Sequence, residues 1–559
     1  MPTCTINGKN CEFQKGDSIL QVAWENGIEI PHYCYHPGLS VVASCRLCLV
    51  EVWAPNPRNE GKLEPIPKLL PACQTPAQDG TEIYSNSPKS IANQRTVMEL
   101  LLINHPLDCP VCDQAGECHL QDYSFRYGRG ESRFEEEKIK QPKKDIGKDI
   151  LLYSDRCIMC TRCVRFTREI SESNELCVNH RGSSEQIDVF PGMPVDNPLS
   201  GNIIDVCPVG AMLDKNFLFQ QRVWFLTQTP SIDGLTASGD NITIDHNEGR
   251  VYRIKPRPNE EVNKWWISDE LRWGWDFIHS EDRLHFPLRQ QQGTQVETNY
   301  DLAYEIIDRG FTNAARAEGG RLALLVSPML TCEEAHLLAK YIKSYDPQAI
   351  MGVGPVPVKG EDQIFAKDKR GEYLLCAEKC PNRRGVERVL RAHADNVLDY
   401  ETFLATVADK KNSITGVLVT GNYPRSWTSK DLKKALSKKF TVLLDTFPND
   451  ISGSVDVVLP VATWAEKSGT FENHQGRLQV FEQAIAPVEF SKSEGQFMED
   501  LINLAQGDTA ETPGKPRIFN AARIRSILAE EMGLTEFVSE VHMPDPPAPV
   551  ESDMELVEL

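Results

Sequence analysis

Long apolar runs and basic residues are what this sequence has little of. No stretch reaches the roughly 18 apolar residues that a membrane span needs, and residues 1–10 lack the charged start and apolar core of a secretory signal. Lys and Arg number 60 against 80 Asp and Glu, which argues against a nucleic-acid partner bound through its phosphates. We therefore expect a soluble cytoplasmic protein that contacts a membrane only through partners.

Cysteines are almost absent from the second part of the chain. Of the 17 cysteines, 14 lie at or before Cys207, and the remainder holds only Cys332, Cys376 and Cys380. A cytoplasmic location disfavours disulfides, so the clustered thiols indicate metal binding. With 559 residues the chain is too long for one core and predicts roughly three to four domains. We expect a redox head followed by a cysteine-poor body.

The first residues are typical of a β-grasp domain. Asn7-Gly8 suits the tight turn of a hairpin between Thr3–Ile6 and Asn10–Phe13. The pattern predicts a following helix over Ser18–Asn26, with Asp17 as its cap.

Four cysteines in and after this domain could surround one site: Cys34, Cys45, Cys48 and Cys73. Their gaps of ten, two and twenty-four residues resemble the plant-type layout of a [2Fe-2S] cluster. The longer first gap fits the ferredoxin-like domains of respiratory and hydrogenase proteins better than photosynthetic ferredoxins. A zinc knuckle is the alternative, because zinc also accepts four thiolates. The β-grasp setting favours iron.

A second group has one histidine and three cysteines: His105, Cys109, Cys112 and Cys118. The apolar run from Val97 to Ile103 predicts a helix, and Pro106 would stop it and direct the His105 ring toward the cysteine loop. One imidazole and three thiolates can hold a [4Fe-4S] cluster, and replacing a thiolate by a neutral ring should raise its potential.

A third group matches the bacterial ferredoxin pattern of a three-cysteine run and a remote Cys-Pro: Cys157, Cys160, Cys163 and Cys207. This is the strongest local signal, and it predicts a second [4Fe-4S] cluster. Cys4, Cys11 and Cys177 are interpreted as packed thiols. Arg46, Arg162 and Arg165 lie beside these cysteines in the sequence, where they could offset cluster charge or be solvated surface residues.

Together these motifs resemble the family of large iron-sulfur subunits of respiratory complex I (NADH-quinone oxidoreductase). The likeness is carried by Cys45-Arg-Leu-Cys48, the segment from His105 to Cys118, Cys157-Ile-Met-Cys-Thr-Arg-Cys163 and Asp205-Val-Cys-Pro-Val-Gly-Ala211, and it extends over most of the chain. Some members hold a further [4Fe-4S] cluster soon afterwards. This sequence has no cysteine between Pro208 and Thr331, so we expect that cluster to be absent.

The body from about Arg222 resembles the molybdopterin oxidoreductase family, at His246–Lys255 and Asp456–Phe471. Buried strands at Leu322–Val326, Thr415–Thr420 and Val442–Asp445 and helices at Cys332–Tyr345 and Ser429–Ser437 predict doubly wound α/β units. No cysteine here has a convincing molybdenum-ligand setting, and members of the complex I family generally keep this fold without the cofactor. We expect a scaffold.

The expected architecture is an α/β multidomain chain, divided as follows: 1–85, a [2Fe-2S] ferredoxin-like β-grasp domain; 86–145, a [4Fe-4S] domain with histidine and cysteine ligands; 146–220, a [4Fe-4S] ferredoxin-like domain; 221–300, a degenerate molybdopterin-oxidoreductase N-terminal domain lacking a cluster; 301–535, a molybdopterin-oxidoreductase-like α/β domain; 536–559, an acidic tail containing prolines.

The resemblance implies an electron-transfer subunit in the peripheral arm of the complex. A partner flavoprotein that binds FMN and NADH, with a small [2Fe-2S] subunit, would supply single electrons. A ferredoxin-like subunit with two [4Fe-4S] clusters would accept them on the way to quinone. The membrane arm would be reached indirectly, on the cytoplasmic side of the bacterial inner membrane.

Two other functions compete with this interpretation. The electron-transfer subunit of an NAD-linked hydrogenase or formate dehydrogenase can have a similar head, and a non-redox structural or zinc-binding scaffold belongs to another class. Weaker signals are interpreted conservatively: Gly352–Pro355 as a loop and Cys376 and Cys380 as ordinary thiols.

Overall fold

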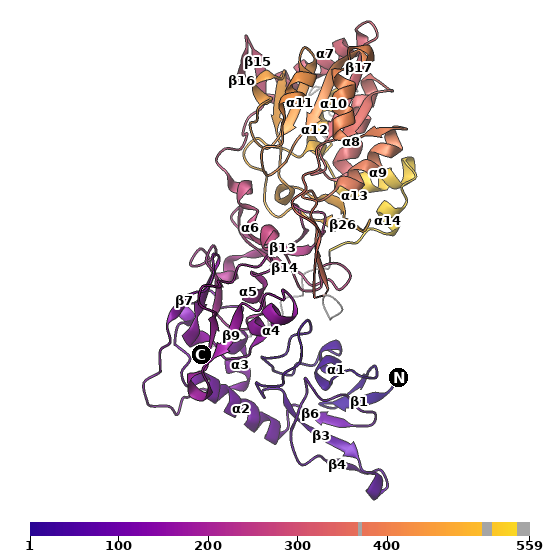
Figure 1. Ribbon diagram of the computed structural model, residues 1–559. Coiled ribbons are helices and arrows are strands. Elements are labelled where there is room, and N and C mark those ends of the chain that lie inside the picture. Colours follow the sequence, from indigo (N-terminus) through magenta and orange to yellow (C-terminus); the bar gives the residue numbers. More distant parts are fainter. Residues whose placement is uncertain (367–371, 506–516, 545–559) are drawn as a thin grey trace, which may run out of the picture. The chain divides into compact units, whose positions relative to one another are not determined.

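The computed structural model describes residues 1–366, 372–505 and 517–544 (Figure 1). The chain forms two compact units, and each is described by itself. The N-terminal unit comprises Met1–Leu226 with Phe365–Glu372, and the C-terminal unit comprises Thr227–Ile364 with Tyr373–Leu559. None of the helices in the described ranges is both long enough and apolar enough to cross a bilayer.

The N-terminal unit begins with a sheet in the order β2-β1-β6-β3-β4, with β5 also paired to β3. The predicted hairpin is confirmed, since β1 and β2 pair antiparallel around Asn7 and Gly8, both at positive φ. Helix α1 buries its apolar face in the domain core. The elements are β1 (Thr3–Ile6), β2 (Lys9–Glu12), α1 (Ile19–Glu25), β3 (Leu49–Pro55), β4 (Leu63–Pro65), β5 (Leu70–Pro71) and β6 (Glu82–Tyr84).

The cap of helix α1 differs from the prediction. Ser18, not Asp17, is the N-cap: its hydroxyl accepts from the Gln21 amide at 3.3 Å, and the Gln21 side chain accepts from the Ser18 amide at 2.9 Å. This reciprocal capping box satisfies two amides that Asp17 could not reach together. The Asp17 carboxylate instead accepts from the Gln14 amide.

The rest of the N-terminal unit consists of short helices and strands joined by long loops. Its strands form a three-stranded sheet, β11-β8-β7, and a two-stranded sheet, β10-β9. The elements are α2 (Pro88–Leu102), α3 (His119–Tyr127), β7 (Lys143–Asp145), β8 (Ile150–Tyr153), α4 (Arg162–Glu169), β9 (Leu176–Asn179), β10 (Gln186–Val189), α5 (Asn202–Val206) and β11 (Met212–Asp214). Helix α2 contains most of the predicted Val97–Ile103 helix.

The C-terminal unit begins with a three-stranded antiparallel sheet, β12-β13-β14, followed by an eight-stranded sheet in the order β16-β15-β24-β23-β22-β17-β18-β21. The first elements are β12 (Thr227–Ile232), β13 (Asn241–Asn247), β14 (Arg250–Pro256) and α6 (Asp269–Trp273). The later ones are β15 (Leu288–Gln291), β16 (Thr294–Glu297), α7 (Tyr300–Arg316), β17 (Arg321–Val326), α8 (Cys332–Tyr345), β18 (Ile350–Val353), β19 (Gln363–Phe365), β20 (Tyr373–Leu375), α9 (Arg383–His393), β21 (Val397–Leu398), α10 (Tyr400–Ala408), β22 (Ile414–Thr420), α11 (Lys430–Leu436), β23 (Phe440–Asp445), β24 (Val457–Pro460), β25 (Gly469–Glu472), β26 (Leu478–Phe481), α12 (Glu494–Ala505), α13 (Ala521–Glu531) and α14 (Glu536–Ser539).

Six neighbouring strands of the large sheet, from β24 to β21, run parallel, as the doubly wound prediction required. Both faces are covered, because successive residues of β17 enter two different cores: Leu322 and Leu324 join one cluster, and Ala323 and Leu325 join the other. The chain order across these strands reverses between β17 and β22, which makes that pair the topological switch point.

Two regions of this unit qualify the predictions. The predicted loop at Gly352–Pro355 begins inside strand β18, where Gly352 packs against the Phe403 ring and leaves no room for a side chain. In the predicted tail, Phe537 is fully buried and the His542 amide donates to the Leu478 carbonyl. Residues 545–559 of that tail lie outside the described part of the chain.

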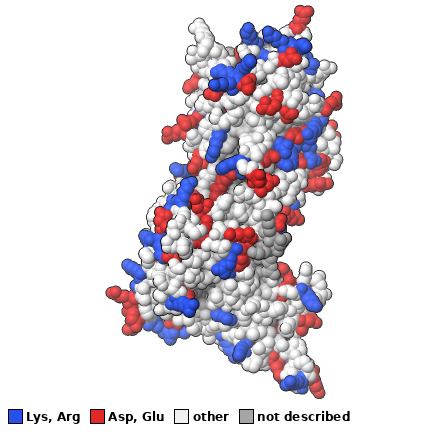
Figure 2. All heavy atoms as spheres, in the orientation of Figure 1, with Lys and Arg blue, Asp and Glu red and all other residues white. Residues whose placement is uncertain are grey.

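The surface carries both signs of charge. Figure 2 shows acidic and basic side chains interspersed over the visible face, although the formal net charge of the chain is −20.

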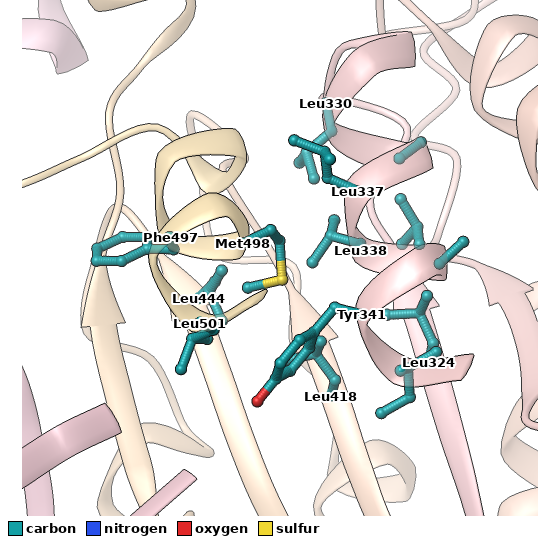
Figure 3. Close-up of a cluster of buried hydrophobic side chains, with 14 of the residues drawn as sticks. Leu324, Leu330, Leu337, Leu338, Tyr341, Leu418, Leu444, Phe497, Met498 and Leu501 are labelled. Atoms are coloured by element: carbon teal, nitrogen blue, oxygen red, sulfur yellow. The ribbon is translucent and has the colours of Figure 1, made fainter. Parts of the chain in front are cut away.

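The larger core depends on the contact between helices α8 and α12. Leu338 and Tyr341 of α8 face Met498 and Leu501 of α12 above strands β22 and β23 (Figure 3), and all four are buried.

Leu338→Ala should lower the free energy of unfolding of the C-terminal unit by about 2–5 kcal/mol, because it leaves a cavity that the parallel sheet cannot close. Urea unfolding followed by circular dichroism measures this loss. Leu504→Ala, on the exposed side of α12, is the control and should change the midpoint little. Equal midpoints for the two variants would contradict the assigned core.

Candidate metal centres

The first group of predicted ligands meets inside the β-grasp domain. Cys34 lies in the loop after α1, Cys45 and Cys48 precede β3, and Cys73 follows β5. The Cys34 thiol shares hydrogen bonds with those of Cys45 and Cys73, and the Cys48 thiol shares one with Cys73. All but the half-buried Cys45 are buried. The sequence-predicted set is therefore brought together in full.

The acidity of these four thiols is divided between them. Hydrogen bonds from Cys45 and Cys73 lower the pKa of the Cys34 thiol, and the bond from Cys73 lowers the pKa of Cys48. The same bonds, with burial, raise the pKa values of Cys45 and Cys73. Two thiols thus keep their protons while the other two lose theirs more easily, and a bound metal group would displace the remaining protons.

Backbone geometry also favours negative charge here. Ala43 and Arg46 have positive φ, and this loop turns the amides of Ser44 and Cys45 toward the Cys34 sulfur. Successive amides in such a turn form the concave anion site found around many iron-sulfur groups. The loop suits a group held by thiolates.

Three of the four residues of the second group line a cavity of about 860 Å³. His105 lies beyond the end of α2 and lines the cavity with Cys109 and Cys118, and Cys118 is also the N-cap of α3. Burial, with the charges of Arg156 and Lys138, lowers the pKa of His105 to about 4. The ring is neutral near pH 7, which is the state that binds metal.

Cys112, the fourth member of the second group, is buried in the neighbouring loop rather than in the lining of the cavity. The Arg222 guanidinium donates to the Cys112 carbonyl at 2.8 Å. A methyl group placed on Gly210 would come within 2.3 Å of the Cys112 sulfur. Gly210 therefore sets the space available to this thiol.

The third group lines one small enclosed space. Cys157, Cys160, Cys163 and Cys207 all face it, together with apolar neighbours such as Ile187. Burial raises the pKa of Cys157 to about 12 and that of Cys160 to about 11. These thiols are protonated near neutral pH unless a cation replaces the proton.

Amides are directed at these sulfurs as well. The Met159 amide donates to the Cys157 sulfur at 3.4 Å, and the Arg162 amide at the start of α4 donates to Cys160. Met159 and Thr161 have positive φ, so the three-cysteine run wraps around the space it encloses.

The other cysteines are located elsewhere. Cys4 and Cys11 are opposite one another on β1 and β2 and are buried, and Cys177 lies in β9 with its sulfur 3.3 Å from the Asn179 side-chain oxygen. Cys376 and Cys380 are buried in the C-terminal unit. In the described ranges, no group of three or more His, Cys, Asp or Glu side chains is arranged so that it could hold a metal ion. An iron-sulfur cluster does not need three side chains around one ion, because its ligands bind several different irons.

Sequence reasoning missed three residues that support these sites. Arg156 is buried, donates to the Asp108 carboxylate at 2.7 Å and covers the Tyr153 ring. Arg222 and Gly210 fix the loop of Cys112. Only the position of Gly210, three residues after Cys207, could have drawn attention to it.

Models of known protein families match five segments of the chain. Residues 1–88 match a 2Fe-2S iron-sulfur cluster binding domain, 94–133 an NADH-ubiquinone oxidoreductase-G iron-sulfur binding region, and 147–213 the ferredoxin-like domain of NADH-quinone oxidoreductase subunit 3. Residues 226–276 match an NDSU1/NuoG-like 4Fe-4S domain and 388–503 match molybdopterin oxidoreductase.

Curated relatives carry matching names. An NADH-quinone oxidoreductase subunit of Rickettsia felis is 36% identical over 370 residues, which are 66% of this chain and 52% of that protein. The mitochondrial NADH-ubiquinone oxidoreductase 78 kDa subunit of Neurospora crassa is 42% identical over 301 residues, 54% of this chain and 39% of that protein. The chain is thus similar to large iron-sulfur subunits of NADH-quinone oxidoreductase.

The chain spans about half the length of the curated relatives that it matches. Among solved structures, a chain of an NAD⁺-reducing [NiFe]-hydrogenase in the H₂-reduced state is 29% identical, with a TM-score of 0.35, and the match covers 40% of this chain and 91% of that one. The family matches confirm ferredoxin-type, 4Fe-4S-type and molybdopterin-oxidoreductase-type regions in the predicted order.

The 4Fe-4S match at residues 226–276 falls on a segment without cysteine. In this chain, Asp233 and Asp240 are buried there: Asp233 accepts from the amides of Leu235 and Thr236, and Asp240 accepts from the Tyr373 hydroxyl. Burial raises the pKa of Asp233 to about 6. The absence of a fourth cluster stays a prediction.

Gly210→Ala should reduce the iron bound at the second group, because its new methyl would displace the Cys112 sulfur. The loss should be close to four irons per chain, the content of one [4Fe-4S] cluster. Iron and acid-labile sulfide analysis of the purified protein measures it.

Gly453→Ala is the matched control, since a methyl there meets nothing within 4 Å. Full iron content in Gly210→Ala would show that Cys112 is not required at its observed position.

Proposed function

We propose that the chain is an electron-transfer subunit of NADH-quinone oxidoreductase that relays single electrons from the NADH-oxidising FMN subunit toward quinone. The observation that carries this proposal is the convergence of the first four thiols, drawn from three separate loops of a β-grasp domain. The second and third groups follow in the same compact unit, and the family matches agree in their order.

Three clusters are assigned to three ligand sets. One [2Fe-2S] cluster is assigned to Cys34, Cys45, Cys48 and Cys73; one [4Fe-4S] cluster to His105, Cys109, Cys112 and Cys118; and one [4Fe-4S] cluster to Cys157, Cys160, Cys163 and Cys207. Such clusters, when bound, accept and donate one electron at a time.

The chain's own residues adapt each site to a cluster. Amides directed at the sulfurs of Cys34, Cys157 and Cys160 stabilise thiolate charge. The neutral His105 ring presents a lone pair and adds no negative charge. In the third group Cys160 and Cys163 are buried and Cys157 and Cys207 are half-buried, which limits the access of water to these ligands. These features would set the reduction potentials of the clusters; they do not act on a substrate.

The C-terminal unit is proposed to be a scaffold without molybdopterin. In doubly wound sheets a ligand binds outside the carboxyl ends of the strands at the switch point. Here side chains of the protein occupy that place: Thr420 accepts from the Ser327 amide, and Asn422 donates to Glu494. Asn422 and Glu494 are buried, so the carboxyl ends are filled by an internal polar network.

The proposed partners follow from the family. The flavoprotein that binds FMN and NADH, with its small [2Fe-2S] subunit, would lie upstream, and a ferredoxin-like subunit with two [4Fe-4S] clusters would lie downstream. The chain would be peripheral, on the cytoplasmic side of the bacterial inner membrane, and would reach the membrane arm indirectly.

Iron analysis tests the cluster count. Purified protein should contain about ten irons per chain, two from the [2Fe-2S] cluster and four from each [4Fe-4S] cluster. It should be brown and, after reduction, give three sets of electron paramagnetic resonance signals. Colourless protein that contains zinc would reject the electron-transfer function, and substantially more iron would reject the absence of a fourth cluster.

His105→Cys tests the histidine ligand. A fourth thiolate adds negative charge, so the reduction potential of that [4Fe-4S] cluster should fall while its iron is retained. A redox titration followed by electron paramagnetic resonance measures the shift. His180→Cys, at an exposed position outside the three groups, is the control. An unchanged titration in His105→Cys would show that His105 is not a ligand.

A further inference from the structure

Helix α4 carries two buried arginines. Arg162 and Arg165 are 5% and 4% exposed, whereas Arg168 on the same helix is exposed. The sequence allowed Arg46, Arg162 and Arg165 to be solvated surface residues. Arg46, beside Cys45, is exposed and fits that alternative. Burial distinguishes Arg162 and Arg165 from the arginines that merely neighbour a cysteine in the sequence.

Arg165 connects the loops of two sites. Its guanidinium donates to the carbonyl of Cys34 at 2.5 Å and to that of Cys160 at 3.3 Å, and it also donates to the Ser40 carbonyl at 2.5 Å. Cys34 belongs to the first ligand set and Cys160 to the third. One planar group with several N–H donors therefore holds a ligand residue of each set.

Arg162 makes a second connection between the same loops. It donates to the carbonyl of Tyr35, next to Cys34, at 2.5 Å and to that of Val206, next to Cys207, at 3.4 Å. The Ser40 amide donates to Glu169, at the end of α4, at 2.8 Å. Helix α4 is thus hydrogen-bonded to the loop of the first site from its first turn to its last.

The two guanidiniums differ from other buried cations in their partners. Within the described ranges, Arg162 and Arg165 form no ion pair with a carboxylate, and their hydrogen-bond partners are carbonyl oxygens. By contrast, buried Arg156 pairs with Asp108 and buried Arg283 with Glu466, both at 2.7 Å. Two buried positive charges side by side are costly unless a negative group lies nearby.

The charges of both arginines act on sulfurs of the proposed ligands. The charge of Arg162 acts on Cys160, Cys207 and Cys34, and that of Arg165 acts on Cys160. A cluster bound by four thiolates carries net negative charge, and its reduced state carries one charge more. A fixed cation favours that reduced state and raises the reduction potential.

We propose that Arg162 and Arg165 are positioning residues that serve as shared counter-charges for the first and third ligand sets, raising the potentials of both and fixing one site relative to the other. This inference rests on the proposed function, because it needs clusters at both sets. The second set, which includes His105, has Arg156 and Asp108 as its own charge pair. The potential of its cluster should therefore not depend on Arg162 or Arg165.

The experiment compares Arg162→Gln and Arg165→Gln with Arg168→Gln in the full-length protein. Glutamine keeps a donor but removes the charge, and Arg168 is the matched exposed arginine on the same helix. In each buried variant, the potentials of the [2Fe-2S] site and of the Cys157–Cys207 site should fall by about 59 mV or more, a tenfold change for a one-electron couple. The potential of the His105 site and both potentials in Arg168→Gln should not move.

Arg165→Lys and Arg162→Lys separate charge from structure. If they restore the potentials that glutamine lowers, the charge is responsible, as proposed. The proposal is overturned if the glutamine variants keep wild-type potentials with full iron content. It is also overturned if they lose iron and lysine does not restore it, or if all three sites shift equally. A wild-type protein without iron-sulfur signals would instead reject the proposed function, before any variant is compared.

Discussion

The hydrogen-bonded thiols of Cys34, Cys45, Cys48 and Cys73 join three loops in the interior of the β-grasp domain, and much of the N-terminal unit is built outward from them. The carbonyl of Cys34 is held by Arg165, which also holds the carbonyl of Cys160. The loop after Cys207 in turn places Gly210 against the Cys112 sulfur. A continuous series of contacts therefore runs through all three ligand sets. Their separations are fixed by packed backbone and not by flexible linkers.

Much of this arrangement could be predicted from the sequence, because the relevant signals are local. Two-residue gaps between cysteines force neighbouring thiols to one side of a turn, and Asn7-Gly8 requires a tight hairpin. The buried strands β17, β22 and β23 were visible as continuous apolar runs.

The remainder depends on tertiary packing, which short-range patterns do not record. Arg46, Arg162 and Arg165 look equivalent in the sequence, yet only the two on α4 are buried. Gly210 matters because of a sulfur about a hundred residues away in the chain. The choice of Ser18 over Asp17 as a cap follows from which residue can pair with Gln21. The lowered pKa of His105 likewise depends, after burial, on the charges of Arg156 and Lys138, which lie far along the chain.

The C-terminal unit shows a different solution to burying charge. At its switch-point edge, Lys467 donates to Glu334 at 2.9 Å and to Glu494 at 2.7 Å, and all three are fully buried. Such a network is tolerable only when every member has partners, since an unpaired buried ion costs several kcal/mol. Asn422 completes it by donating to Glu494. The unit thus pairs these interior charges among its own side chains.

The partners of the buried cations differ between the two units. In the C-terminal unit the buried cations Arg283 and Lys467 each meet carboxylates of the same unit. In the N-terminal unit Arg162 and Arg165 meet carbonyl dipoles and the fields of cysteine sulfurs. The N-terminal unit can also pair a buried cation with a carboxylate, as it does for Arg156 and Asp108. The positive charge on α4 is then complementary to the anionic clusters proposed for the first and third sets, so the distribution of counter-charge supports the same proposal as the cysteine spacing.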